Sequence, residues 1–407
     1  MTVADHPTRT GDARRLLATR GVRALVDGTV ATILPAYLLA RGLRPSQVGA
    51  VITCTLLGSA AVTLAVGLRG AHLDRVRLLQ VIAVAMIVTG LAFGLAASFV
   101  ALAVVATLGT INPSGGDVSA FLPVEQSLLP ETVPTHERTR LFARYALVAA
   151  LAGAVGALAA GLPGVLSHHT SLSELDGLRL VFVVYALAGS LILVLYRGLQ
   201  PRPPAEGTRR GLDRSRAVVY RLAALFSIDA FGGGFAGQSI LVLWLALHFH
   251  LSTATAGAVF FWSGLLSASS ALLAPRLAAR IGLIRTMVFT HLPANGLLMA
   301  AALMPSAPLA VACLLARALL SQMDGPARTS YVMAVVDPDE RAAAASITNV
   351  PRSLASALPP LAAGWLLEHS SFGWPLLIAG TLKIVYDLSL LRLFKDVRPP
   401  EELEPAA

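Results

Sequence analysis

The 407-residue chain is 55% hydrophobic and only 14% charged, with a mean hydropathy of +0.69. A soluble protein of this size cannot bury so much apolar surface, whereas runs of about 20 apolar residues match the thickness of a bilayer core. The net charge of +9 would suggest nucleic-acid binding in a soluble protein, but here the basic residues lie between apolar runs, which indicates a helical membrane protein in a lipid bilayer with no nucleic-acid partner.

Apolar runs predict twelve membrane-spanning helices that follow a polar segment over residues 1–21. This segment lacks the pattern of a cleavable signal peptide, so we expect it to stay on the chain in the cytoplasm. In the first half the predicted spans cover about residues 22–40, 47–68, 79–97, 100–122, 142–163 and 178–196. In the second half they cover about residues 218–247, 254–274, 286–304, 307–325, 343–366 and 373–393.

The stretch 197–217 is the only long polar interruption between apolar blocks. It is rich in arginine and contains Pro201, Pro203 and Pro204, so it predicts a solvated connector rather than a helix. We therefore expect two six-helix bundles over 22–196 and 218–393, joined by a basic linker, and a tail over 394–407.

Basic residues also predict the orientation of the chain. Most of the 32 lysines and arginines fall on segments that share one side of the membrane, and only Arg41, Arg44 and Arg179 fall on the other. This asymmetry places both termini in the cytoplasm, with the protein in the inner (plasma) membrane of the cell.

The two halves repeat each other at an offset of 203 residues. The triplet at 136–138 aligns with that at 339–341, and the segment 158–161 aligns with 361–364. Chance similarity between alanine-rich helices is the alternative, but polar residues agree as well as alanines. Parallel repeats of this kind are typical of transporters that rock about a central site.

Two predicted spans contain residues that break helices. The seventh holds Gly232, Gly233 and Gly234, so we expect it to bend or partly unwind. The fourth contains Asn112, Pro113 and the glycines that follow, which expose backbone carbonyls at membrane depth. There Asn112 and Asp117 could face a substrate or ion, or the stretch could be a plain kink.

The turn after the second span reads Gly70-Ala71-His72-Leu73-Asp74-Arg75-Val76-Arg77. It resembles the G-x-x-x-D-R-x-G-R signature of the major facilitator superfamily, with Arg77 where the family usually has glycine. Together with the twelve spans, the basic central loop and the repeat, the resemblance covers nearly the whole chain. It implies a bacterial, all-α transporter of two pseudo-symmetric six-helix bundles, in which Gly70, Asp74 and Arg75 belong to a cytoplasmic gate.

Acidic side chains within the spans are candidates for proton coupling, because a charge in hydrocarbon is costly unless it faces a cavity or a partner. We single out Asp27, Asp229 and Asp117. For Asp27 the alternative is a structural pair with Arg23, four residues earlier on the same helical face. For Asp229 no cation lies within one helical turn, which favours a functional role.

Glu125 and Arg328 correspond at the same offset of 203. They could pair across the halves as part of the cytoplasmic gate, or both could be solvated. Lys383 and Asp387 lie four residues apart on the twelfth span and predict an internal structural pair.

Buried arginines could bind an anionic group of the substrate or neutralise one of the acids. The residues expected to line a substrate cavity are Asn112, Arg144, Tyr145, Arg317, Arg352, Gln238 and Trp262. The sequence predicts no catalytic residue, no metal site and no cofactor, since phosphate-binding loops and metal-ligand spacings are missing from it.

The fifth span has Gly153, Gly156, Gly161, Pro163 and Gly164, which loosely resemble the glycine-proline motif of drug exporters. Close helix packing explains the same glycines. The favoured hypothesis is a monomeric, proton-coupled exporter of small molecules. Proton-coupled uptake or facilitated diffusion of a nutrient is the runner-up, and a membrane receptor or membrane enzyme is a remote alternative.

Overall fold

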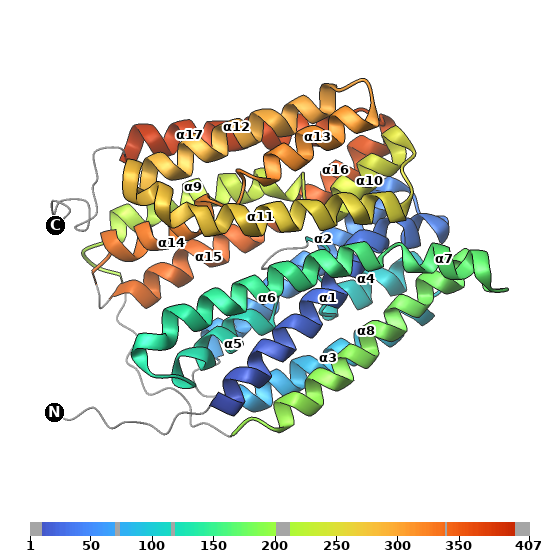
Figure 1. The fold of residues 1–407 in the computed structure, drawn as a ribbon, viewed down its shortest axis with the longest axis horizontal. Coiled ribbons are helices and arrows are strands. Elements are labelled where there is room, and N and C mark those ends of the chain that lie inside the picture. The colour runs from blue at the N-terminus through green and yellow to red at the C-terminus, as the bar shows by residue number, and fades with distance from the viewer. Residues whose placement is uncertain (1–9, 70–73, 115–118, 201–211, 338–339, 395–407) are drawn as a thin grey trace. The chain divides into compact units, whose positions relative to one another are not determined.

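The computed structural model describes residues 10–69, 74–114, 119–200, 212–337 and 340–394, which form helices joined by short turns (Figure 1). The first half contains α1 (Thr10–Ala40), α2 (Pro45–Arg69), α3 (Arg75–Leu95), α4 (Phe99–Leu108), α5 (Phe121–Leu128), the 3-10 turns η2 (Leu129–Glu131) and η3 (Thr135–Glu137), α6 (Arg138–Ala159), α7 (Leu162–His169) and α8 (Glu174–Arg197). The second half contains α9 (Arg216–Gly234), α10 (Gln238–Phe249), α11 (Thr253–Ile281), α12 (Leu283–Leu303), α13 (Ala307–Ala318), α14 (Asp324–Val335), α15 (Arg341–Ala357), α16 (Pro359–His369) and α17 (Trp374–Phe394).

The protein is an all-α membrane protein. Eight helical segments of the described residues are long and apolar enough to cross a bilayer, and α4 and α13 are shorter apolar helices. Helices occupy every predicted span, but five of those spans are interrupted. The breaks fall between α4 and α5, α6 and α7, α9 and α10, α13 and α14, and α15 and α16.

Two of these breaks were expected from the sequence. The helix α9 ends at Gly234, as the three glycines predicted, and an added Cβ at that glycine would lie 2.5 Å from the carbonyl oxygen of Ser356. Glycine is therefore needed there for close approach of two backbones. In the other break, Asn112 is not helical, and its Oδ1 accepts hydrogen bonds from the backbone nitrogen and hydroxyl of Ser114 at 3.2 and 2.7 Å.

The first helix is longer than the predicted span of about 22–40, because α1 already begins at Thr10. Its added turns are packed rather than solvated: Leu16 and Thr19 are buried. The Arg15 guanidinium donates to the carbonyl oxygen of Gly198, which ties the start of α1 to the end of α8. Charged residues did not stop the helix, since arginine and alanine are good helix formers.

The chain divides into two compact units. Unit 1 comprises Met1–Leu43, Cys54–Glu206 and Thr253–Phe261, and unit 2 comprises Arg44–Thr53, Gly207–Ser252 and Trp262–Ala407. The first residues of α2 thus belong to unit 2, and the first residues of α11 to unit 1.

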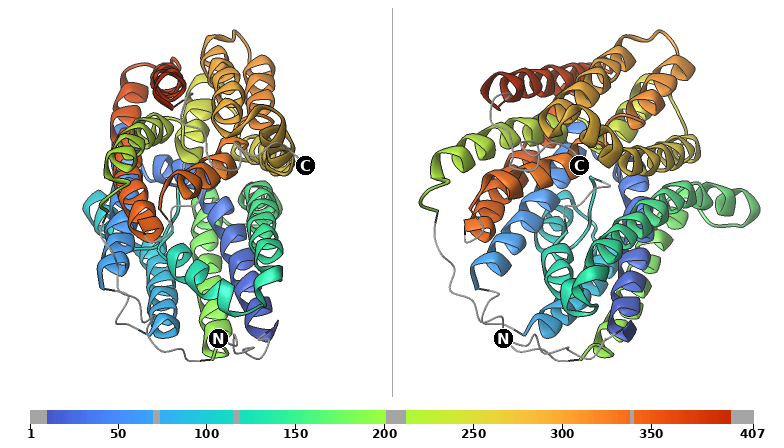
Figure 2. Two further views of the ribbon diagram at one scale, coloured as in Figure 1. Left: turned by 90° about the vertical axis from the view of Figure 1, so that its left-hand side faces the viewer. Right: turned by 60° about the vertical axis from the view of Figure 1, so that its left-hand side comes forward.

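Within each unit the long helices pack side by side. In unit 1, α1 lies against α6 and α8, and α3 lies against α8; in unit 2, α9 lies against α15 and α17, and α12 against α17 (Figures 1 and 2). The contact between α1 and α6 is made through glycines, because a Cβ at Gly28 would lie 2.2 Å from the carbonyl oxygen of Gly153. Small residues at such crossings let helices approach closely in a membrane.

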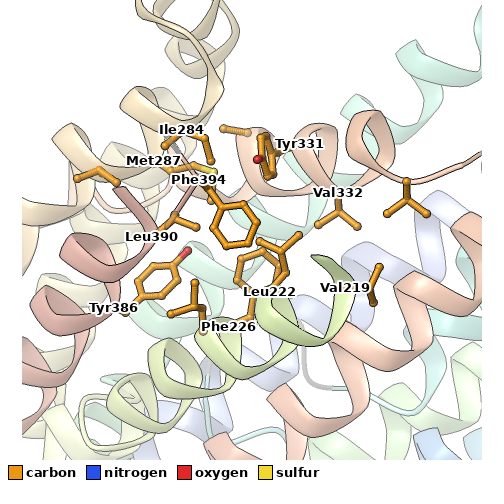
Figure 3. Packing of buried hydrophobic residues seen from close by; sticks show 14 of the residues in the cluster. Val219, Leu222, Phe226, Ile284, Met287, Tyr331, Val332, Tyr386, Leu390 and Phe394 are labelled. Atoms are coloured by element: carbon orange, nitrogen blue, oxygen red, sulfur yellow. The ribbon is translucent and has the colours of Figure 1, made fainter. Parts of the chain in front are cut away.

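The apolar core of unit 2 is built from α9, α12, α14 and α17. Figure 3 shows Phe226, Met287, Tyr331 and Tyr386 packed together among aliphatic side chains. The ring of Phe226 meets that of Tyr386 edge-on, with centroids 6.4 Å apart. The core packs together the helices that carry the charged residues of unit 2.

The start of α2 is fixed to α16 within unit 2. Glu368 accepts a hydrogen bond from the backbone nitrogen of Ser46 at 3.1 Å and lies 3.9 Å from the Arg44 guanidinium. The bond from Ser46 and the charge of Arg44 lower the pKa of Glu368 below its ordinary value. A Cβ at Gly49 would lie 2.2 Å from the carbonyl oxygen of Pro360, so this contact also depends on a glycine.

Candidate functional site

A buried carboxylate in unit 1 collects four donors from three helices. We call this group the Glu125 cluster; it consists of Glu125, Arg23, Thr19, Tyr145 and Tyr196. Arg23 donates from Nη2 to Oε2 of Glu125 at 2.6 Å, Thr19 and Tyr196 donate to Oε1 at 2.9 and 2.5 Å, and Tyr145 donates to Oε2. Both charged side chains are closed to solvent, with Glu125 at 0% and Arg23 at 1% exposure.

The break before α5 positions this carboxylate. It lets α5 begin at Phe121, whose ring lies under the Arg23 guanidinium at 4.6 Å from its centroid. Glu125 follows one turn later and points at the same arginine. A buried ion pair of this kind is stable only when its remaining hydrogen-bonding groups are also satisfied, and here the two tyrosines and Thr19 do so for the carboxylate.

Asp27 lies one turn beyond Arg23 on α1, and its carboxylate, unlike that of Glu125, does not collect hydrogen-bond donors from the described part of the chain. It is 7% exposed, and its Oδ1 has no hydrogen-bond partner among the described residues. The prediction of a structural Arg23–Asp27 pair is wrong, because Arg23 donates to Glu125 and also approaches the hydroxyls of Tyr196 and Tyr145 at 3.4 and 3.5 Å. Asp27 is therefore a buried acid without a bonded base.

A second charged group lies within unit 2. We call it the Asp229 cluster; it consists of Asp229, Lys383, Arg328, Asp324, His291, Asp387 and Asn295. Lys383 donates to Oδ1 of Asp229 at 2.6 Å, and Arg328 donates to Oδ2 at 2.8 Å and also to Asp324. Asp229 is 4% exposed, so α9 is joined to α14 and α17 by buried charge pairs.

The remaining members of the Asp229 cluster form a chain of hydrogen bonds. Nδ1 of His291 lies 2.9 Å from Oδ1 of Asp387, and Asn295 donates to Oδ2 of the same carboxylate at 3.0 Å. Nε2 of His291 lies 3.9 Å from Asp229. The predicted Lys383–Asp387 pair is wrong, since Lys383 reaches across to α9 and Asp387 is bonded from α12.

Glu125 and Arg328 each have their partners within their own unit, and both are buried. The alternative in which both are solvated is therefore wrong. The proposed pairing of Glu125 with Arg328 is not needed to satisfy either charge. Sequence reasoning missed Thr19, Tyr196 and Asn295 as members of the clusters, because nothing in their local sequence marks them.

The predicted gate turn is described in part. Gly70 lies outside the described residues. Asp74 caps α3 by accepting from the backbone nitrogens of Val76 and Arg77 at 2.9 and 3.3 Å. Arg75 forms a bidentate pair with Glu131, in which Nη1 donates to Oε1 at 2.7 Å and Nη2 donates to Oε2 at 3.2 Å. The turn is thus anchored to α3 and to η2 inside unit 1.

The candidate cavity residues are not brought into one described group. Tyr145 belongs to the Glu125 cluster, while Asn112 is buried and caps its own turn. Arg144 and Trp262 are exposed. Gln238 is the first residue of α10, and Asp117 lies outside the described residues.

Among the residues that the structure describes, the acids near Arg317 and Arg352 in unit 2 form no salt bridge with either arginine. Both guanidinium groups lie within electrostatic range of Asp229 and Asp324. Those two acids are already bonded by Lys383 and Arg328. In the ranges that the structure describes, no group of histidine, cysteine and acidic side chains is arranged to hold a metal ion.

Comparisons with known proteins agree with this architecture. A family model described as Major Facilitator Superfamily matches residues 16–321 and 223–407. An uncharacterized membrane protein of Saccharomyces cerevisiae, YJR124C, is 23% identical, and the match covers 95% of this chain and 94% of the yeast protein.

Solved structures show the same fold at lower identity. A D-xylose–proton symporter matches with a TM-score of 0.75 at 16% identity, over 97% of this chain and 99% of the symporter. A bacterial homolog of the human lysosomal transporter Spinster, in an inward-facing and unoccupied conformation, matches with a TM-score of 0.73 at 16% identity, over 98% of this chain and 100% of the homolog.

Proposed function

The chain belongs to the major facilitator superfamily and is a membrane transporter rather than an enzyme, and we propose that it exports small molecules in exchange for protons. In this proposal it works as a monomer in the cell membrane, with twelve spans and both termini in the cytoplasm. Binding of substrate and proton alternates the side on which the cavity opens.

The proposal of proton coupling rests on the different partners of two buried carboxylates, Asp27 and Asp229. Asp229 is bonded by Lys383 and Arg328, so a proton would have to compete with two bonded side chains, and Asp229 is a poor proton carrier. Asp27 is similarly buried, but no base among the described residues is bonded to it. A buried carboxylate without a partner is costly to keep charged, so of these two acids Asp27 is the more ready to take up a proton.

The groups that face Asp27 suggest how a proton could change the structure. They are Arg20 and Arg23 on its own helix and Tyr185 on α8. When Asp27 loses its proton, its negative charge competes with Glu125 for Arg23, one turn away. A shift of Arg23 toward Asp27 would loosen the contact between α1 and α5, which couples proton release to movement of helices in unit 1.

Export rather than uptake is proposed from the glycine-rich α6 and α7, which resemble the motif of drug exporters. In the structure these glycines also serve packing: a Cβ at Gly156 would lie 1.9 Å from the carbonyl oxygen of Leu25. The helix that carries Asp27 thus crosses the motif, because Thr29 of α1 donates to the carbonyl oxygen of Gly156 at 2.8 Å.

Transport in reconstituted vesicles tests the direction. With an imposed pH gradient, an antiporter concentrates its substrate in the acidic compartment, because protons leave that compartment as the substrate enters. A symporter concentrates substrate in the alkaline compartment instead, which would support the uptake alternative. If substrate transport does not depend on the pH gradient, the protein is a facilitator and the proposed proton coupling is wrong.

A further inference from the structure

The positive and negative charges around Asp229 in unit 2 are unequal in number. Around Asp229 the described residues include the acids Asp229, Asp324 and Asp387 and the bases Lys383, Arg328, Arg317 and Arg352. With His291 counted as neutral, this region carries one more positive charge than negative. An excess charge at membrane depth is costly unless something compensates for it.

The pairing within this region shows where the excess lies. Asp229 is bonded to Lys383 and Arg328, Asp324 is bonded to Arg328, and Asp387 is bonded by His291 and Asn295. Every acid is therefore satisfied without Arg317 or Arg352. Nε of Arg317 is buried and has no hydrogen-bond partner in the part of the chain that the structure describes. The interpretation that these arginines neutralise Asp229 fails, because that carboxylate already has two bonded cations.

Arg352 lies on a helix with a polar face. Along α15, Ser346, Asn349 and Ser353 recur at intervals of three and four residues, which places them on one side, and Arg352 adjoins them. Ser346, Asn349 and Arg352 are exposed. A guanidinium and an amide are not stable against acyl chains, so this face needs water or a polar ligand.

We propose that the substrate is an organic anion and that its anionic group binds to Arg352 and Arg317. This inference rests on the proposed function and names the substrate class of the same transporter. A guanidinium presents a planar set of donors that matches a carboxylate or phosphate, and it stays charged at any working pH. An anion here removes the excess positive charge and satisfies the open donors, whereas an organic cation adds to the imbalance.

Thermal shift of the purified full-length protein in detergent tests the proposal. The probes are compounds with one skeleton and different end groups: benzoate, phenyl phosphate, benzamide and benzylamine, and likewise succinate, succinamide and putrescine. Each is added at about 10 mM, enough to reveal millimolar binding, at constant ionic strength. We expect stabilisation by anions only. The proposal is overturned if no anion stabilises the protein or if amides or amines stabilise it as well as the matched anions.

Variants then locate the anion. Arg352→Gln and Arg317→Gln should each weaken binding of the stabilising anion by about ten- to a hundredfold, as expected for loss of a charge-assisted hydrogen bond. Arg352→Lys keeps the charge but cannot form a bidentate contact, so it should bind the anion more tightly than Arg352→Gln and less tightly than the wild type. Arg392→Gln, at the exposed end of α17, is the control and should bind as the wild type does. Unchanged affinity in both glutamine variants contradicts the proposal.

A size-exclusion profile and the unfolding temperature without ligand show whether each variant is folded. If a glutamine variant unfolds, the lysine variant at the same position is measured in its place, and it should still prefer anions but bind them more weakly. This assay needs neither a membrane nor a proton gradient. Its failure therefore overturns the anion site alone, whereas intact binding without transport in vesicles would overturn the proposed function.

Discussion

Arg23 donates to Glu125 on α5 across 2.6 Å rather than to Asp27, one turn away on its own helix. The pair is closed to solvent, and two tyrosines and a threonine complete the hydrogen bonds of the carboxylate. This choice of partner leaves Asp27 as a buried acid without a bonded base. The stability of unit 1 and its proposed proton site thus depend on the same arginine.

Removing one member of the Arg23–Glu125 pair should destabilise the protein strongly. Arg23→Met or Glu125→Met alone leaves an uncompensated buried charge, which costs about 3–5 kcal/mol of unfolding free energy. The double variant should lose less than the sum of the two single variants, because neither charge remains. Equilibrium unfolding in mixed micelles measures the unfolding free energies of the wild type, the two single variants and the double variant. If the losses of the single variants add up in the double variant, the two side chains are not coupled.

Asp229 should matter for stability and not for proton coupling. Asp229→Asn leaves Lys383 and Arg328 without their shared acid, and we expect a loss of about 3 kcal/mol or more. The pH dependence of transport should keep its midpoint, because the carboxylate is already bonded to Lys383 and Arg328 and is not the proposed proton carrier. A shifted or abolished pH dependence in Asp229→Asn vesicles would make Asp229 the carrier instead.

Glu340 should make the stability of unit 2 depend on pH. Its carboxylate accepts from the backbone nitrogens of Asp213, Arg214 and Ser215 at 2.8, 2.9 and 2.9 Å, just before α15 begins. These hydrogen bonds, that from Ser215 foremost, lower the pKa of Glu340 from its ordinary value of 4.5 to about 2. Since the folded-state pKa is the lower one, the stabilisation is complete above pH 4.5 and is lost as pH falls toward 2.

Glu340→Gln should therefore lower the unfolding temperature at neutral pH and should flatten its decline between pH 5 and pH 3 relative to wild type. Glu137 gives a matched control, because it occupies the equivalent position before α6 and its side chain is exposed. Glu137→Gln should change neither the unfolding temperature nor its pH profile. Equal effects of the two variants would contradict a special role for Glu340.

The crossing of α1 and α6 should tolerate no added methyl group. Gly28→Ala places a Cβ 2.2 Å from the carbonyl oxygen of Gly153, so the helices must separate and both stability and transport should fall. The loss expected for such overpacking is about 1–3 kcal/mol. Gly296→Ala is the control, since that glycine lies within α12 with nothing within 4 Å of the added atom. A harmless Gly28→Ala would show that the two helices are free to separate.

Local sequence patterns predicted much of the fold. Apolar runs located the helices, and the glycines at 232–234 predicted a bend or partial unwinding where α9 ends at Gly234. The repeat also holds at the level of elements, because α6 begins at Arg138 and α15 at Arg341, the residues that the alignment paired. These features could be predicted because each depends on neighbouring residues or on composition.

The partners of the buried charges could not be predicted in the same way. Glu125 and Arg23 are 102 residues apart, and Asp229 and Lys383 are 154 apart. Such pairs depend on how helices pack, and spacing along one helix gave the wrong partner for both Arg23 and Lys383. The early start of α1 was also missed, because its first turns contact α5 through Thr19 and the end of α8 through Arg15, and no local pattern reveals these contacts.

Proton movement driven by substrate in vesicles tests the central claim most directly. In wild-type vesicles that contain a pH-sensitive dye, adding substrate on one side should move protons in the opposite direction. Asp27→Asn vesicles should still exchange labelled substrate but move no protons, while the exposed control Asp176→Asn should behave as the wild type does. Substrate-driven proton movement that persists in Asp27→Asn would contradict the assignment of Asp27 as the proton carrier.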